Sequence, residues 1–169
     1  MKITAQEEYG LRCLLRLAAV PAGSEFPLGI RDIAEAEGLS VPYVAKLLAI
    51  LRQAGLIESV RGRQGGYRLA RPAEEISLGE ALRVLGEPLF EESSYCENHA
   101  SPEGHDTCVH SNDCAVRAVW RGLDDLIAGV LNRVSLAELL VPEEAMERAF
   151  AAPGRVPLPL SGGTRDRPI

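Results

Sequence analysis

The sequence predicts a mainly α-helical protein with a small β-hairpin, built as a winged helix-turn-helix domain plus a long C-terminal dimerisation helix. Three observations predict this fold class. Apolar residues recur at helical spacing in several short segments, a glycine-containing turn joins two of these segments, and two β-type runs around a glycine-rich turn follow directly. Aromatic residues make up 5% of the chain, which favours a core of aliphatic side chains between helices.

The first three predicted helices contain the helix-turn-helix. Residues 5–20 place several leucines on one stripe of a helix. A second, short helix over residues 31–37 stops at Gly38, and Ser40 caps a third helix that carries Pro42 in its first turn. Two helices joined by a short turn with glycine are typical of DNA-binding proteins, although many helical hairpins bind no nucleic acid.

The residues after the third helix strengthen the case for DNA binding. We expect two strands, 56–60 and 67–69, around a turn with three glycines. A basic hairpin after a recognition helix is a wing, which holds the DNA backbone or minor groove while the helix enters the major groove. The recognition helix is predicted at about 41–54 and the wing at about 56–70. The predicted DNA contacts come from both elements: Ser40, Val41, Tyr43, Ala45, Lys46, Arg61, Arg63, Gly65, Gly66 and Tyr67.

The charge of the chain is unevenly distributed. The whole chain has a formal net charge of −6, but residues 43–71 hold six basic residues and one acid, Glu58. Affinity for phosphate depends on such a local patch more than on the total charge. The basic residues of this stretch are Lys46, Arg52, Arg61, Arg63, Arg68 and Arg71.

The chain as a whole divides into four predicted parts. The DNA-binding domain covers residues 1–86 and closes with a short helix over 76–85. Residues 87–114 read as an irregular loop, and residues 115–140 as a dimerisation helix with apolar residues three and four apart. Such a helix suits packing against a second copy in a dimer that reads a palindrome, or packing into its own core. Residues 141–169 are expected to form a tail that holds one or two more helical turns beyond Glu143 and then a disordered segment rich in proline and glycine.

The loop contains three of the four cysteines within nineteen residues: Cys96, Cys108 and Cys114. Thiolates are soft ligands that suit iron–sulfur clusters and zinc. The gaps of eleven and five residues lack the close pairs of a zinc ribbon and fit a cluster on a loop with one further ligand from elsewhere. Zinc held by these cysteines and His99 is one alternative, and a thiol redox switch without metal is another. Cys13, within the first helix, is expected to be a small core residue.

Four segments also carry a family resemblance: KITAQEEYGLRCLLRLA, IRDIAEAEGLSVPYVAKLLAILRQAGLIESVRGRQGGYRLAR, ISLGEALRVL, and the cysteines with AVRAVWRGL after the last one. They resemble the IscR/NsrR-type family of iron–sulfur, winged helix-turn-helix transcription regulators over roughly residues 1–140. The resemblance implies a homodimer that binds a palindromic operator in double-stranded DNA. It also implies an operator affinity controlled by an iron–sulfur cluster that senses cluster status, redox poise or nitric oxide.

The resemblance further implies a ligand set for a [2Fe–2S] or [4Fe–4S] cluster: Cys96, Cys108 and Cys114, with one more residue. In such proteins the fourth ligand is a histidine shortly after the last cysteine or an acidic residue of the partner subunit's first helix. The residue three positions after Cys114 is Arg117, so Glu8 matches the second option. An acid in the first turn of a helix also suits the helix dipole without any ligand role. The loop histidines stay open as rivals: His99, His105 and His110.

Other classes of function fit less well. The sequence shows no glycine-rich phosphate loop, catalytic triad or paired catalytic carboxylates, so we predict that the protein is not an enzyme. A metal- or cluster-carrying protein that does not bind DNA is a rival. No apolar run approaches the ~18 residues that span a bilayer, and acidic residues lie where a signal peptide would be apolar. We therefore expect a cytoplasmic protein without membrane contact, in which clustered cysteines bind metal or react.

Overall fold

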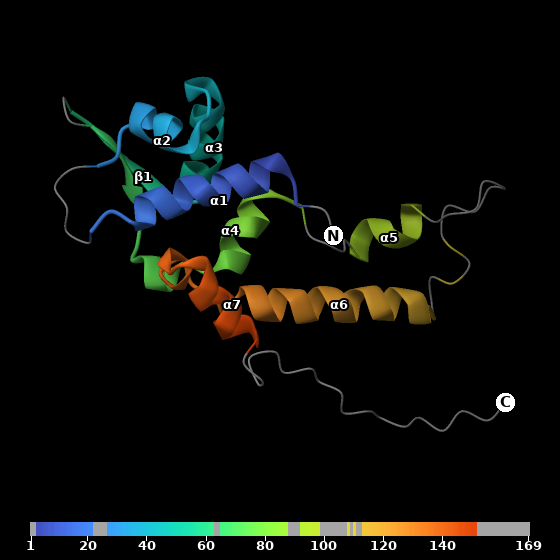
Figure 1. The fold of residues 1–169 in the computed structure, drawn as a ribbon. Helices are drawn as coiled ribbons and strands as arrows, with labels where there is room; N and C mark the ends of the chain where they lie inside the picture. Colours follow the sequence, from blue (N-terminus) through green and yellow to red (C-terminus); the bar gives the residue numbers. More distant parts are fainter. Residues whose placement is uncertain are drawn as a thin grey trace, which may run out of the picture.

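The computed structural model describes residues 3–21, 27–62, 65–87, 92–98, 108, 110 and 113–151. The helices and strands in chain order are α1 (Ala5–Ala18), α2 (Ile30–Glu37), α3 (Val41–Gln53), β1 (Ile57–Val60), β2 (Gly66–Leu69), η1 (Ala73–Glu75), α4 (Leu78–Leu85), α5 (Glu92–Asn98), α6 (Ala115–Leu131), η2 (Glu138–Leu140) and α7 (Glu143–Ala151). Helices α1 to α4 and the hairpin gather in one body, and α6 extends away from it with α5 alongside (Figure 1). The predicted class, mainly α with a small hairpin, is confirmed.

The helix-turn-helix consists of α2, a short turn and α3. Gly38 ends α2 with φ 64°, a left-handed conformation that glycine adopts without the steric cost of a Cβ. Ser40 takes the extended N-cap conformation before α3, and Pro42 lies in the first turn. Ser40 is the N-cap of α3, as predicted, but its side chain makes no capping hydrogen bond; the Ser40 carbonyl accepts from the backbone N–H of Val44.

The hairpin pairs β1 and β2 in antiparallel register, from Ile57 opposite Leu69 to Val60 opposite Gly66. A residue from before α2 also pairs with it. The Leu28 N–H donates to the Tyr67 carbonyl at 3.0 Å, and the Tyr67 N–H donates to the Leu28 carbonyl at 2.9 Å. The wing is therefore attached to the segment that leads into the helix-turn-helix, because Leu28 lies two residues before α2.

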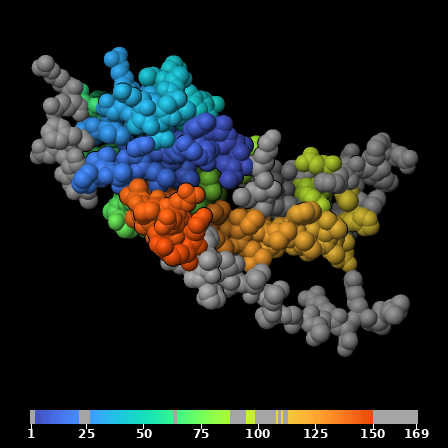
Figure 2. Space-filling view, viewed as in Figure 1, coloured from blue at the N-terminus to red at the C-terminus, as the bar shows by residue number. Residues whose placement is uncertain are grey.

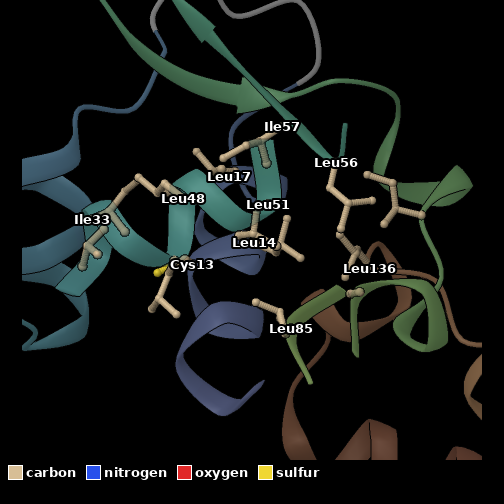
Figure 3. Packing of buried hydrophobic residues seen from close by; sticks show 14 of the residues in the cluster. Cys13, Leu14, Leu17, Ile33, Leu48, Leu51, Leu56, Ile57, Leu85 and Leu136 are labelled. Carbon is tan, nitrogen blue, oxygen red and sulfur yellow. The ribbon is translucent and has the colours of Figure 1, made fainter. Parts of the chain in front are cut away.

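The hydrophobic core lies between α1, α2, α3, α4 and the base of the hairpin (Figure 3). Leu47, Leu48 and Leu51 of α3 are fully buried, and Leu14 of α1 and Ile33 of α2 are buried in the same cluster. Each fully buried aliphatic side chain of this size stabilises the fold by about 1.5–3 kcal/mol relative to an exposed one. The core thus fixes one face of α3 and leaves the opposite face to solvent.

The C-terminal half differs from the sequence prediction at two places. Helix α5 lies inside the stretch 87–114 that was expected to be irregular. The helix expected over 115–140 ends at Leu131. Helix α7, over 143–151, forms where one or two helical turns were expected at the start of the tail. Residues 152–169 lie outside the described part of the chain.

The early end of α6 has a physical cause in the pairing that follows it. The Leu78 N–H donates to the Val134 carbonyl at 2.7 Å, and the Leu136 N–H donates to the Ile76 carbonyl at 2.9 Å. Ser77 and Ser135 form a bridge between these bonds. The chain must leave the helix for Leu136 to reach the core, where it is fully buried. No helix within the described ranges is both long and apolar enough to cross a bilayer.

Candidate nucleic-acid interface and cysteine site

The exposed face of α3, with its N-cap, carries four of the ten predicted DNA-contact residues. Ser40, Val41, Ala45 and Lys46 are all exposed there. Tyr43 is half-buried, and its ring packs edge-on against the ring of Tyr9 in α1 with centroids 6.2 Å apart. Helix α3 therefore presents mostly small side chains and the positive charge of Lys46 on a surface that can approach DNA closely, while Tyr43 links that helix to α1.

The basic stretch 43–71, which includes the wing, presents less free positive charge than its composition suggests. Arg68 pairs with Glu58 across the two strands at 2.5 Å, and Arg71 pairs with Glu80 of α4. Arg61 is exposed at the tip, next to Gly62, whose φ of 128° suits glycine. Exposed ion pairs of this kind contribute little to stability, so Arg68 can exchange its carboxylate for a phosphate at small cost.

The other predicted wing residues shape the hairpin. A Cβ on Gly65 would lie 2.5 Å from the Val60 carbonyl oxygen, and one on Gly66 would lie 2.5 Å from the Leu28 carbonyl oxygen. Both glycines therefore allow backbone segments to approach closely. Tyr67 is half-buried and pairs with Leu28. Arg63 lies outside the described residues.

Two of the three loop cysteines converge on one residue of α6. Cys114 is the N-cap of α6, and its Sγ accepts from the Arg117 backbone N–H at 3.4 Å. The guanidinium Nη1 of Arg117 donates to the Sγ of Cys96, on α5, at 3.0 Å. Both cysteines and Arg117 are half-buried. The two thiols thus lie near the start of the same helix although they come from different elements.

The donor set is suited to a soft metal, but the cysteines are not arranged around one point. Cys96, Cys108 and Cys114 are free, half-buried thiols. Among the described residues, however, no group of three or more Cys, His, Asp or Glu side chains could hold a metal ion. The structure brings Cys96 and Cys114 to Arg117, and Cys108 does not complete a metal-binding group with them. His110 is exposed, and His99 and His105 lie outside the described residues.

The proposed fourth ligand, Glu8, lies in the first turns of α1 and pairs with a residue one helical turn later. Its Oε1 accepts from Arg12 Nε at 2.8 Å and lies 2.7 Å from Arg12 Nη2. The Arg12 guanidinium also lies over the Tyr9 ring, 5.7 Å from its centroid. Glu8 raises the pKa of Arg12 through this hydrogen bond and its charge. Because both side chains are about half exposed, the pair is one that a stronger ligand can displace.

The fourth cysteine, Cys13, has a purely structural environment. It is fully buried in the core, and this burial raises the pKa of its thiol to about 11. The thiol therefore stays protonated at neutral pH and packs as a small apolar side chain.

Helix α6 carries an exposed apolar face. None of residues 115–131 is buried, and four large apolar side chains of its first half are exposed: Val116, Val119, Trp120 and Leu123. Figure 2 shows that α6 extends beyond the body formed by α1 to α4. Contiguous apolar surface of this kind on a protein commonly marks an interaction site. We refer to these four residues as the α6 face.

Sequence comparison identifies the family. The sequence model of the Rrf2 family, described as an iron-dependent transcriptional regulator, matches residues 3–142. This chain belongs to the Rrf2 family. It is 38% identical over 140 residues to protein rrf2 of Nitratidesulfovibrio vulgaris, covering 83% of this chain and 87% of that protein. It is 32% identical over 147 residues to the HTH-type transcriptional regulator IscR of Escherichia coli, covering 87% and 85% respectively.

Solved structures of Rrf2-type regulators have the same fold. T. potens IscR aligns with a TM-score of 0.63 at 33% identity, over 91% of this chain and 94% of that one. CymR of B. subtilis, a global cysteine regulator, aligns with a TM-score of 0.62 at 30% identity, over 82% and 95%. The family resemblance and the prediction of a non-enzymatic regulator are confirmed, since the relatives are transcriptional regulators.

Sequence reasoning missed two residues of this Rrf2-family chain that the structure places at the candidate sites. In the sequence analysis Arg117 was used only to show that no histidine follows Cys114 at that position, yet Arg117 contacts both Cys96 and Cys114. Its position three residues after Cys114, one helical turn into α6, was the available signal. Tyr9, which links Arg12 to Tyr43, had no signal in the sequence beyond its position beside Glu8.

Proposed function

We propose that this Rrf2-family regulator binds a palindromic operator as a homodimer and that an iron–sulfur cluster controls its affinity for DNA. The observation that carries the proposal is the cysteine site. Three free, half-buried thiols lie in or near the segment that leads into α6, and two of them meet at Arg117 in its first turn. The same helix carries the α6 face, and the helix-turn-helix, α2 and α3, lies on the opposite side of the molecule from α6 (Figure 1).

Cys96, Cys108 and Cys114 would hold a [2Fe–2S] or [4Fe–4S] cluster, with Glu8 from a second subunit as the fourth ligand. A bound cluster supplies one-electron redox chemistry and reactivity toward oxidants and nitric oxide. The cysteine thiols must lose their protons to act as ligands, so uptake of iron releases protons. The three cysteines must also come together around one point, which makes ligation a conformational event for the segment before α6.

The α6 face supports the homodimer. Val119 is 59% exposed and Trp120 is 46% exposed, which is unusual for large apolar side chains in a helix that ends in the folded body. A second copy related by a twofold axis would cover this face and set the spacing of two recognition helices. On DNA, Val41, Ala45 and Lys46 would lie near base edges or phosphates. Arg61 and Arg63 would hold the backbone or minor groove.

A route of contacts connects the proposed fourth ligand to the recognition helix. Glu8 holds Arg12, Arg12 lies over Tyr9, and Tyr9 packs edge-on against Tyr43 of α3. Recruitment of Glu8 as a ligand would release Arg12 and change the contacts of Tyr9. A coupling of ~1–3 kcal/mol between the two sites is enough for a useful switch in DNA affinity.

The test is anaerobic purification followed by iron, sulfide and zinc analysis and a visible absorption spectrum. We expect coloured protein with stoichiometric iron and sulfide, both lost in Cys108→Ala and retained in Cys13→Ala. Binding of operator DNA by cluster-loaded and cluster-free protein, compared under the same salt, then measures the control of affinity. Loaded protein that binds no DNA would instead favour a metal- or cluster-carrying role.

A second candidate function is a regulator that responds through its thiols alone or through zinc. It is favoured by the convergence of Cys96 and Cys114 without Cys108, and by the structural similarity to CymR, a cysteine regulator. Colourless protein with one zinc per chain would support a zinc regulator. Colourless protein without metal after reconstitution, whose DNA binding changes on mild oxidation, would support a thiol switch.

A further inference from the structure

Arg117 connects the two helices that carry Cys96 and Cys114. Its backbone N–H donates to Cys114 Sγ at 3.4 Å, as the third residue of a helix commonly does to an N-cap side chain. Side chains of a helix lean toward its N-terminus, so the guanidinium of Arg117 reaches back past the start of α6 toward α5. There its Nη1 donates to Cys96 Sγ at 3.0 Å.

We propose that Arg117 is a positioning residue of the cysteine site. In the cluster-free protein its guanidinium holds the Cys96 sulfur beside the first turn of α6, so that Cys96 and Cys114 are presented together. With iron bound, the same guanidinium donates to the Cys96 sulfur as a partner outside the ligand set. The role of Arg117 with iron bound rests on the proposed function, whereas its role in the cluster-free protein does not depend on that function.

The chemistry of the site defines what Arg117 contributes in each state. Three thiolates and a carboxylate give a ligand set with four negative charges, and a guanidinium is permanently positive. Hydrogen bonds to ligating sulfurs and nearby positive charge favour the reduced, more negative state of a cluster. Arg117 therefore raises the reduction potential of a cluster held by Cys96 and Cys114. A lysine at this position keeps the charge but loses the planar, multi-donor geometry.

The first experiment measures how close the two thiols lie without any metal. It uses the full chain with Cys108→Ala, which leaves Cys96 and Cys114 as the accessible thiols because Cys13 is fully buried. The dithiol reagent dibromobimane becomes fluorescent when it bridges both sulfurs. We expect Arg117→Ala to slow bridging by about fivefold, which corresponds to a lost interaction of about 1 kcal/mol. Arg117→Lys should recover part of the rate.

The matched control is Arg133→Ala. Arg133 is exposed just beyond the other end of α6, so its substitution removes the same charge far from the thiols. Its bridging rate should equal that of the parent, with unchanged far-UV circular dichroism in all variants. Equal bridging rates in Arg117→Ala and the parent would overturn the positioning role.

The second experiment measures the midpoint potential of anaerobically reconstituted protein with all cysteines present. Arg117→Ala should shift the potential to a more negative value, Arg117→Lys less so, and Arg133→Ala should leave it unchanged. An identical potential in Arg117→Ala and the parent would overturn the second part of the proposal. If the parent chain takes up no cluster, the proposed function and the role of Arg117 with iron bound are both refuted. The bridging rates still decide whether Arg117 positions Cys96 in the cluster-free protein.

Discussion

Substitution of Gly66 by alanine is expected to detach the wing from the segment before α2. The backbone of Gly66 has no positive φ, so alanine can adopt its conformation and the cost is purely steric. The added Cβ would lie 2.5 Å from the Leu28 carbonyl oxygen and 2.8 Å from its carbonyl carbon. These are backbone atoms that cannot rotate away, so the wing or Leu28 must move.

The magnitude follows from what that movement breaks. Two backbone hydrogen bonds join Leu28 and Tyr67, at 2.9 and 3.0 Å, and each contributes about 0.5–1.5 kcal/mol net. Replacing glycine by alanine also restricts the unfolded chain, which offsets about 0.4–1 kcal/mol. We therefore expect a net loss of about 1–2 kcal/mol in the free energy of unfolding.

Urea unfolding at fixed chain concentration, followed by circular dichroism, measures this loss. The matched control is Gly122→Ala, since an added Cβ there meets no atom within 4 Å and α6 favours alanine over glycine by up to about 1 kcal/mol. Gly66→Ala should also weaken binding to specific and nonspecific DNA alike, under conditions where it is fully folded. A variant as stable as the parent would refute the described attachment, and undiminished DNA binding would refute the role of the wing.

Three further substitutions test other parts of the proposal. Arg61→Ala should weaken binding to all sequences and reduce the slope of log affinity against log salt by about 2 per dimer, and an unchanged slope excludes a phosphate contact. Trp120→Glu should convert the dimer to a monomer by light scattering, while Trp120→Phe keeps it; a dimeric Trp120→Glu protein would exclude the α6 face as the interface. Tyr9→Leu removes an aromatic pair of about 0.5–1.5 kcal/mol. It should therefore reduce the affinity difference between cluster-loaded and cluster-free protein by roughly threefold, and the same difference in both proteins would show that the Tyr9–Tyr43 contact carries no coupling.

The helix-turn-helix and the hairpin were predictable because their signals are local. Gly38 marks the end of α2 by a left-handed conformation that other residues rarely adopt, and Pro42 marks the first turn of α3. The buried positions of α3 recur three and four residues apart, which any periodicity analysis detects: Val44, Leu47, Leu48 and Leu51.

The features that escaped prediction depend on contacts far apart in the sequence. Helix α5, with the sequence ESSYCEN, has no apolar stripe, and it packs against α6, where Arg117 binds Cys96. The apolar spacing of α6 continues past Leu131 to Val134, but the pairing of Ser135 with Ser77 ends the helix. Likewise, the pairing of Glu58 with Arg68 across the hairpin reduces the free charge of a wing that looks strongly basic in sequence.

The position of Cys114 would suit a switch that acts on the proposed dimer and on α3, the proposed recognition helix, by separate routes. Cys114 is the N-cap of α6, and Val116 of the α6 face follows two residues later. A change at the Cys114 sulfur would therefore reach the proposed interface within one helical turn. Helix α3 packs on α1, and the route to it runs from Glu8 through Arg12 and Tyr9 to Tyr43. A cluster held by Cys114 of one subunit and Glu8 of the other would act on both routes at once. The arrangement of the proposed dimer and the orientation of α3 would then change together.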